Sequence, residues 1–143
     1  FLTAKHQPRA LALLIQKEVA DRIVARDGKE SILSLSVKVY GTPRSVVKVP
    51  AGCFNPPPSV DSAVLLIENV SRNFFDGVSE EIFFKAVKAG FASKRKQLGG
   101  NLEKVFGAKG LQALQAAAID VKTRAEDVKL GEWREIVRHL GEH

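Results

Sequence analysis

Three consecutive prolines, Pro56 to Pro58, constrain the fold of this chain more than any other feature of its sequence. Each proline fixes its φ angle at about −65° and lacks a backbone donor, and each residue before a proline is pushed toward extended geometry. The segment therefore predicts a stiff, polyproline-like rod that joins neither a helix nor the middle of a sheet. Phe54 stands at the front of this rod, and Val60 with Ala63–Ile67 behind it predicts a buried strand.

The aromatic ring of Phe54 has two readings. A rigid segment beside a sheet can present an exposed ring to a flat ligand such as a nucleic-acid base. Alternatively, the segment is an ordinary proline-rich loop before a strand, and the ring is buried in the core. The local pattern leaves both readings open.

The charge of the chain favours an anionic partner. Its 143 residues carry a formal net charge of +6, with no apolar run long enough to cross a membrane and no signal peptide. Cys53 is the one cysteine, so an intramolecular disulfide is excluded and a reducing, cytoplasmic location is expected. Because the sequence opens with Phe1 and not with methionine, we expect its N-terminus to lie within a longer protein.

The first half of the sequence predicts strands and a helix. Arg9–Gln16 is a continuous apolar run, typical of a strand that is covered on both faces in a parallel α/β sheet. Lys17–Arg26 has helical spacing, while Ser45–Val49 and Ser62–Ile67 predict further strands. Ser31–Tyr40 fits one helix face, but its alternation of apolar and polar residues favours a strand.

The composition becomes polar over Glu68–Gly77, where we expect a boundary between an α/β part, residues 1–70, and a helical part, residues 71–143. Ser79 predicts the N-cap of the first helix of the second part. Gly99 and Gly100 are expected to end that stretch of helix. Three more helices are predicted over Asn101–Phe106, Leu111–Ile119 and Lys129–Leu140.

Basic residues are concentrated between Phe83 and Leu111, where one acid, Glu103, accompanies seven cations. Such a cluster is the electrostatic footprint of a phosphate-binding surface. The same charges also fit a solvated helix face, and those at a helix end would complement the helix dipole. The seven residues are Lys85, Lys88, Lys94, Arg95, Lys96, Lys104 and Lys109.

Several kinds of site are not indicated. The three histidines lie near the chain ends without metal-ligand spacing, and there is no glycine-rich nucleotide motif or phosphate loop. Cys53 is expected to be a buried small apolar residue. The residue pattern therefore predicts an α/β part and a basic helical part that contact nucleic acid.

The stretch Phe54-x-Pro-Pro-Pro-x-Val-Asp-Ser-Ala-Val64 resembles the late motif of the ribosomal RNA adenine dimethyltransferase family (KsgA type), which is related to the Erm resistance methyltransferases. It differs from the Asn/Asp-Pro-Pro-aromatic motif of other amino-group methyltransferases, because Asn55 is followed by prolines through position 58. The resemblance favours a helix at Leu35–Val37. Further segments that resemble the family, in the same order, are Leu14–Arg22, Leu35–Val37, Phe91–Leu98 with Asn101–Leu102, and Arg124–Glu126.

The resemblance implies a fold and an activity. Residues 1–70 would form the C-terminal half of a Rossmann-like methyltransferase sheet, and residues 71–143 a small all-helical domain that binds rRNA. Family members transfer methyl groups from S-adenosylmethionine to N6 of two adjacent adenines near the 3′ end of small-subunit rRNA. The family's glycine-rich cofactor loop, ribose-binding acid and Asn-Leu/Ile-Pro-Tyr motif have no counterpart in this sequence. We therefore expect no activity, and no cofactor site, from these 143 residues alone.

The resemblance also implies residue roles. Phe54 would stack on the target adenine, with Asn55 beside it as a second candidate site residue. Glu18 and Asp61 are expected to brace the scaffold and not to act as general bases. The expected contacts to the rRNA backbone are Lys94, Arg95, Lys96 and Arg124, with Lys85 and Lys88.

Two other functions remain compatible with the sequence. The chain can be a non-catalytic module that binds RNA or the ribosome on the same scaffold. It can also be a helical interaction domain whose charge serves only solubility. Whether the chain is part of a dimethyltransferase or a non-catalytic module, its expected partner is the small (30S-type) ribosomal subunit. Exposed strand edges would also allow copies of the chain to self-associate.

Overall fold

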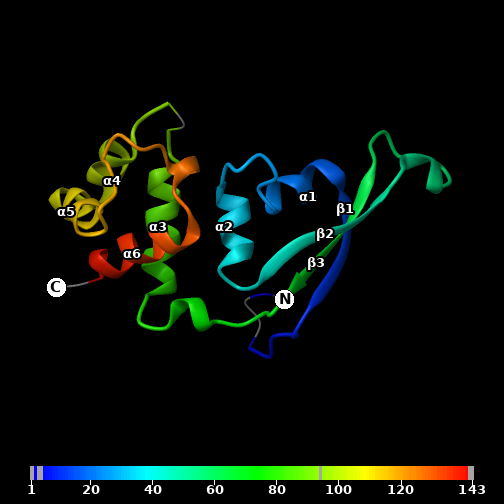
Figure 1. The fold of residues 1–143 in the computed structure, drawn as a ribbon, viewed down its shortest axis with the longest axis horizontal. Coiled ribbons are helices and arrows are strands. Elements are labelled where there is room, and N and C mark those ends of the chain that lie inside the picture. The colour runs from blue at the N-terminus through cyan, green and yellow to red at the C-terminus, as the bar shows by residue number, and fades with distance from the viewer. Residues whose placement is uncertain (1, 3–4, 94, 142–143) are drawn as a thin grey trace. The chain divides into compact units, whose positions relative to one another are not determined.

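The computed structural model describes residue 2, residues 5–93 and residues 95–141, and the chain forms two compact units (Figure 1). The sheet unit comprises residues 1–27 and 33–72, and the helical unit comprises residues 28–32 and 73–143. Strands occur in the first unit and helices in both, so the predicted α/β class is confirmed.

The sheet unit contains three antiparallel strands, β1 (Leu11–Gln16), β2 (Thr42–Val49) and β3 (Ser62–Glu68). Their order is β1-β3-β2, with β3 hydrogen-bonded to both neighbours. The strands were predicted correctly, but the parallel sheet was wrong. The apolar run of β1 is also not covered on both faces, because several of its side chains are exposed.

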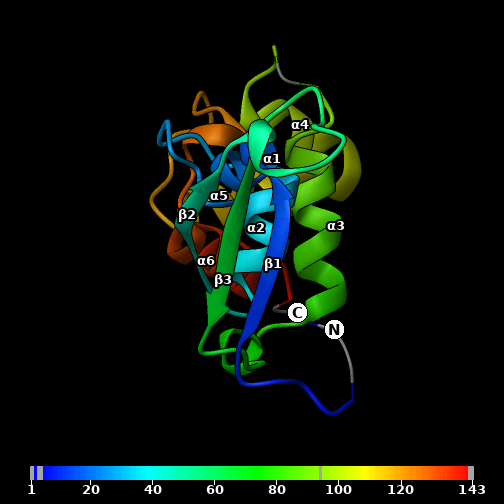
Figure 2. The same ribbon diagram turned by 90° about the vertical axis from the view of Figure 1, so that its right-hand side faces the viewer.

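Two helices, α1 (Lys17–Ile23) and α2 (Ile32–Lys38), cover one face of this sheet and lie behind it in Figure 2. Ile23 and Val37 from the helices pack with Leu65 and Ile67 from β3 to form the buried core of the unit. On β3 every second residue is buried, as expected for a strand with one covered face.

The strand predicted from the alternation over Ser31–Tyr40 is wrong, and the helix implied by the family resemblance is correct. The alternation misled because this helix is enclosed on more than one side. Ser34 and Leu35 are completely buried, and Val37 is also buried, so apolar and small residues fall on successive positions. Periodicity distinguishes a helix from a strand only when one face is exposed.

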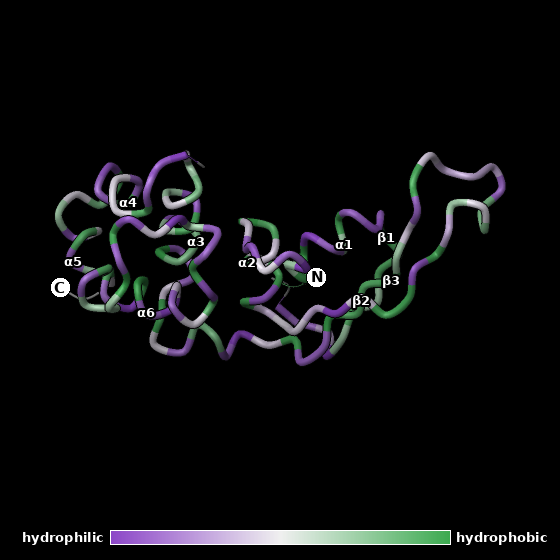
Figure 3. The backbone as a smooth tube through the Cα atoms, turned by 45° about the horizontal axis from the view of Figure 1, so that its top comes forward, coloured by the Kyte–Doolittle hydropathy of each residue, from purple (hydrophilic) through white to green (hydrophobic). Residues whose placement is uncertain are grey.

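The face of the sheet opposite α1 and α2 is apolar. Residues paired directly across antiparallel strands share a face, so Leu14, Val64 and Val47 form one row across β1, β3 and β2. Leu14 is 55% exposed and Val47 is 51% exposed. Figure 3 shows hydrophobic residues along the strands, interrupted by hydrophilic ones. The sheet therefore has one buried face and one exposed apolar face within the described part of the chain.

The helical unit contains α3 (Glu80–Gly90), α4 (Leu98–Phe106), α5 (Ala108–Ala116) and α6 (Leu130–Leu140). Ser79 is the N-cap of α3, as predicted, and its Oγ accepts a hydrogen bond from the Ile82 N–H at 3.3 Å. The predicted break at Gly99 and Gly100 is wrong, because both lie in the first turn of α4.

Two glycines allow close helix packing in this unit. A Cβ atom on Gly90 would lie 2.6 Å from Cη2 of Trp133, and one on Gly110 would lie 2.8 Å from the backbone of Leu102. Trp133 is completely buried, and its ring stacks with Phe91 at a centroid distance of 6.0 Å. Close packing, and not chain flexibility, is therefore the reason for glycine at these positions. Among the described residues, no helix is both long and apolar enough to cross a membrane.

Candidate functional site

Phe54 lies on the long connection between β2 and β3, just after a short 3-10 turn over Ala51–Cys53. The Phe54 N–H donates to the Ala51 carbonyl at 3.2 Å, which fixes the backbone at the start of the proline segment. The predicted rod does not begin at Phe54, because the chain bends over residues 54–56. Val60 is exposed and precedes β3, and Cys53 is exposed, so both residues were wrongly predicted to be buried.

The ring of Phe54 is half-buried and lines an open groove of about 600 Å³. It is therefore not sealed in the core, which was the alternative reading of the sequence. The groove is lined by residues from α1, β1, the proline segment and the start of β3: Leu14, Ile15, Gln16, Val19, Phe54, Pro56, Pro58 and Ser62.

The last three residues of β1, Leu14 to Gln16, form part of the groove wall. Successive residues of a strand point to opposite faces, and Leu14 and Ile15 both contribute to the lining. Within the described chain β1 pairs with β3 alone, so its other edge has no strand partner there. An apolar, partly aromatic wall of this kind can hold a flat ring. Asn55 is exposed beside Phe54, and its predicted role remains a prediction.

Asp61 holds the two ends of this connection together. Its Oδ1 accepts a hydrogen bond from the Ala51 N–H at 2.9 Å, and its Oδ2 pairs with Lys48 Nζ at 3.1 Å. The hydrogen bond from Ala51 and then the Lys48 ammonium lower the pKa of the Asp61 carboxyl. Asp61 therefore stays ionised at neutral pH and braces the scaffold, as expected from the sequence.

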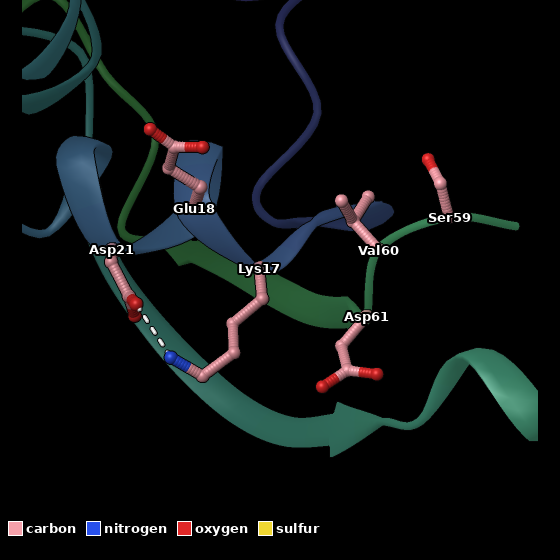
Figure 4. Close-up of a pocket in the computed structure, with 6 residues that line it drawn as sticks. All are labelled: Lys17, Glu18, Asp21, Ser59, Val60 and Asp61. Atoms are coloured by element: carbon pink, nitrogen blue, oxygen red, sulfur yellow. Dashed lines mark hydrogen bonds and ion pairs between the residues drawn. The ribbon is translucent and has the colours of Figure 1, made fainter.

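A second pocket, of about 390 Å³, lies beside Asp61 (Figure 4). Lys17 Nζ is 2.7 Å from Asp21 Oδ2, and Figure 4 shows the Lys17 ammonium directed at Asp21. This hydrogen bond is the main cause of the lowered pKa of Asp21. The remaining lining residues are Glu18, Ser59, Val60 and Asp61. The pocket is therefore lined by the Lys17–Asp21 ion pair.

In the helical unit, two exposed basic loops are joined through the start of α4. The Leu98 N–H donates to the Thr123 carbonyl at 2.8 Å, and the Gly99 N–H donates to the Val121 carbonyl at 2.9 Å. These bonds place the loop with Arg95 and Lys96 beside the segment that ends at Arg124. All three cations are exposed. Lys94 falls outside the described residues, so its predicted role has no structural account.

Asn101 anchors the first of these loops. This residue is 5% exposed, and its Nδ2 donates to the carbonyls of Gly90 at 2.9 Å and of Ser93 at 3.2 Å. The amide thereby connects α4 to the C-terminal end of α3 and to the loop that follows it. Sequence reasoning missed this role, although an asparagine inside an otherwise apolar helix face was the available signal.

The other predicted cations lie on α3. Lys85 and Lys88 are both exposed, and Lys85 Nζ lies 5.2 Å from the centroid of the Phe106 ring. Their predicted contact with rRNA remains a prediction. Lys122 is a further exposed cation, in the loop before Arg124, that the sequence reading did not select.

The described residues do not fit S-adenosylmethionine by themselves. The sheet unit has one junction where a strand passes directly into a helix, and there Gln16 is followed at once by Lys17, without a glycine turn. A tight glycine turn is what allows a backbone to approach a nucleotide-like cofactor closely. The described residues also contain no group of three or more His, Cys, Asp or Glu side chains able to hold a metal ion.

A model of the family described as ribosomal RNA adenine dimethylase matches residues 1–142. The ribosomal RNA small subunit methyltransferase A of Dehalococcoides mccartyi (strain CBDB1) is 42% identical over 139 residues, which are 95% of this chain and 48% of that protein. The protein of the same name from Fusobacterium nucleatum is 36% identical over 130 residues, or 88% and 49% of the two chains. The chain thus spans about half the length of the curated relatives it matches.

Two solved structures have a similar fold. A dimethyladenosine transferase from Plasmodium falciparum superposes with a TM-score of 0.78 at 20% identity, covering 94% of this chain and 59% of that one. The 23S rRNA methyltransferase ErmE superposes with a TM-score of 0.69 at 19% identity, covering 99% and 58% of the two chains. Both likenesses extend over the sheet unit and the helical unit.

Proposed function

Because the chain belongs to the ribosomal RNA adenine dimethylase family, we propose that it supplies the base-holding and rRNA-gripping half of an rRNA adenine N6,N6-dimethyltransferase. The methyl donor would be S-adenosylmethionine. The substrate would be two adjacent adenines near the 3′ end of small-subunit rRNA, presented by a 30S-type particle in the cytoplasm.

The observation that carries this proposal is the placement of the Phe54 ring in the wall of an open groove. An adenine must leave its stack before its N6 amine can react, and stacking on an aromatic ring offsets about 1–3 kcal/mol of that cost. The half-buried ring is held before a base arrives, so little conformational entropy is lost on binding. Asn55, next in the sequence, lies within reach of the same base in this proposal.

The cations of the helical unit would hold the rRNA backbone. Contacts from Lys and Arg to phosphates position a nucleic acid but carry little sequence information. Arg95, Lys96 and Arg124 are exposed on two joined loops, and they have no acidic partner among the described residues. Lys94, Lys85 and Lys88 complete the proposed set.

The cofactor would be held by the half of the relatives that this chain does not span. The residues described above lack a glycine turn that fits it, so no step of methyl transfer is assigned to them. We accordingly expect the 143-residue chain to bind RNA without methylating it.

The proposal is tested by Phe54→Ala in a protein that joins this chain to the missing half of its relatives. Loss of stacking should lower kcat/KM for methyl transfer to small-subunit particles by about 5- to 150-fold, which corresponds to about 1–3 kcal/mol. Phe54→Trp should retain most of the activity, and Val60→Ala on the same connection is the matched control. Unchanged turnover in Phe54→Ala would remove the ring from the site.

A second candidate function is a non-catalytic module that binds RNA or the ribosome. The exposed cationic loops favour it. Replacing Lys94, Arg95 and Lys96 with Gln should reduce the slope of log K against log salt concentration by about two to three. The control removes the same charge from the sheet unit, at Lys5, Arg9 and Arg22. If the two triple variants show the same slope of log K against log salt concentration, the loops do not bind RNA, and both candidate functions lose this contact.

Self-association of the chain is a further proposal. The exposed side chains of Leu14 and Val47, which flank Val64 on one face, and the unpaired edge of β1 offer apolar surface and strand pairing to a second copy. Leu14→Lys should shift sedimentation toward the monomer at concentrations where the unmodified chain associates.

A further inference from the structure

Asp61 joins the two ends of the connection that carries Phe54. The connection leaves β2 at Val49 and returns to β3 at Ser62. Near its start the Ala51 N–H donates to Asp61 Oδ1 at 2.9 Å, so one carboxylate closes a loop of about ten residues. The Asp61 carbonyl also accepts a hydrogen bond from the Lys17 N–H at 2.9 Å, which fixes Asp61 to the first residue of α1.

The path from this carboxylate to the aromatic ring is short. Ala51 is bonded to Asp61 through its N–H and to Phe54 through its carbonyl, at 2.9 Å and 3.2 Å. The intervening turn is closed by a third bond, from the Cys53 N–H to the Pro50 carbonyl at 3.0 Å. Ala51 is therefore the single residue that links the Asp61 carboxylate to the backbone of Phe54.

The rest of the connection offers little other support. Residues 55–60 are all exposed. In the described part of the chain, the bond from Ala51 to Asp61 is the one side-chain hydrogen bond made by residues 50–60. A loop held at few points keeps most of its conformational freedom, and ordering it on ligand binding would cost affinity.

We propose that Asp61 is the positioning residue for the base-holding ring: its carboxylate captures the Ala51 N–H and thereby keeps Phe54 in the wall of the groove. This inference rests on the proposed function, in which Phe54 stacks on the target adenine. Asp61 acts through Ala51 and touches neither the base nor the methyl donor. Lys48 supports the same carboxylate from the end of β2.

A role as general base fits the geometry poorly. Both carboxylate oxygens are engaged, Oδ1 by Ala51 and Oδ2 by Lys48. The groove with Phe54 is lined by other residues, and Asp61 contributes to the second pocket instead. The carboxylate is directed at the scaffold and not at the proposed position of the base.

The first test uses the 143-residue chain and measures amide hydrogen exchange by NMR. Asp61→Ala should speed exchange of the Ala51 amide by about fivefold or more, because its acceptor is lost. Asp61→Asn keeps an acceptor oxygen and should leave that amide protected, as should Lys48→Met, which removes only the ion pair. The amide of Leu65 in β3 reports on the fold in each variant. Unchanged exchange at Ala51 in Asp61→Ala, or rapid exchange in Asp61→Asn, would overturn the inference.

The second test is a double-mutant cycle in a protein that includes the missing half. Asp61→Ala alone should lower methyl transfer by about fivefold or more, but by no more than Phe54→Ala does, because a displaced ring stacks poorly. In a Phe54→Ala background the same change should have almost no further effect, whereas a role elsewhere in the fold would add its full loss. Additive losses would overturn the inference. Unchanged turnover in Phe54→Ala would overturn the proposed function itself, and the exchange experiment distinguishes these two failures.

Discussion

The two units differ in how completely they enclose their apolar side chains. In the helical unit Phe83, Leu98, Leu102 and Trp133 are all completely buried. In the sheet unit Leu65 on β3 is completely buried, but Leu14, on the opposite face of the sheet, is 55% exposed. These large side chains of the helical unit are thus fully enclosed, whereas the sheet unit leaves apolar side chains exposed on one face of its sheet.

This difference separates two ways of presenting a functional surface. The large apolar side chains of the helical unit are buried in its core, so the surface that it offers to a partner consists of exposed loops such as the one anchored by Asn101. The sheet unit presents an apolar face and an apolar groove lined in part by the end of β1. Apolar surface of this kind marks a site of contact with a ligand or with more protein. In the functions proposed above, the groove would hold a base and the open face would contact a second copy of the chain.

The largest expected effect compares the two faces of the sheet. Leu65→Ala should lower the free energy of unfolding by about 2–5 kcal/mol, because it leaves a cavity in the core. Leu14→Ala should lower it by less than about 1 kcal/mol in the 143-residue chain, since the side chain is already half in water. Urea denaturation of both variants measures the difference, and equal losses would show that the open face is covered in solution.

The next effect tests the close packing of the helical unit. Gly110→Ala places a Cβ 2.8 Å from the Leu102 backbone, which cannot move aside as a side chain does. We expect a loss of about 1–3 kcal/mol in the free energy of unfolding. Gly100→Ala is the matched control, because a Cβ there meets nothing within 4 Å and alanine favours the helix by up to about 1 kcal/mol. Calorimetry should show a lower melting temperature for Gly110→Ala and a higher one for Gly100→Ala than for the unmodified chain.

The same contrast explains what the sequence could predict. The strands Ser45–Val49 and Ser62–Ile67 and the cap at Ser79 were predicted correctly, because alternation and capping are local signals. Gly99 was read as a helix breaker, yet its small size is needed against Val121, which is more than twenty residues away. A contact between distant segments has no local signal, so the reason for this glycine was not available from the sequence.

The candidate site divides in a similar way. Phe54 could be selected because the prolines and the family motif surround it in the sequence. Its backbone is held by hydrogen bonds from Phe54 to Ala51 and from Ala51 to Asp61. The second bond joins residues ten positions apart, so the local sequence pattern did not predict it. Cys53 was predicted to be buried from its residue type, but it lies on an exposed turn where the connection leaves the sheet. Burial depends on tertiary packing that the local pattern does not contain.

An intermediate effect concerns Asn101, which links the core of the helical unit to its basic loop. Asn101→Ala removes the donor to the Gly90 and Ser93 carbonyls and should cost about 1–3 kcal/mol of unfolding free energy. Affinity for RNA should also fall, because the loop with Arg95 and Lys96 is no longer held in one position. Gln112→Ala, at an exposed position on α5, is the control. Loss of stability with unchanged RNA affinity would show that the loop needs no anchor.

The smallest expected effect is a pH dependence confined to the sheet unit. The Lys17 hydrogen bond, with charge contributions from Lys17 and Arg26, lowers the pKa of Asp21 from its ordinary value of 3.8. A carboxyl whose pKa is lower in the folded state stabilises the fold above the unfolded-state pKa, and this contribution is lost as the pH falls through the folded-state pKa. Asp21→Asn should therefore destabilise the chain at neutral pH, and this difference should shrink as the pH falls through the folded-state pKa of Asp21, because the carboxyl then becomes uncharged like the amide. Amide exchange of α1 at several pH values measures this directly. A difference in stability between the two proteins that persists in acid would assign the role of Asp21 to packing and not to its charge.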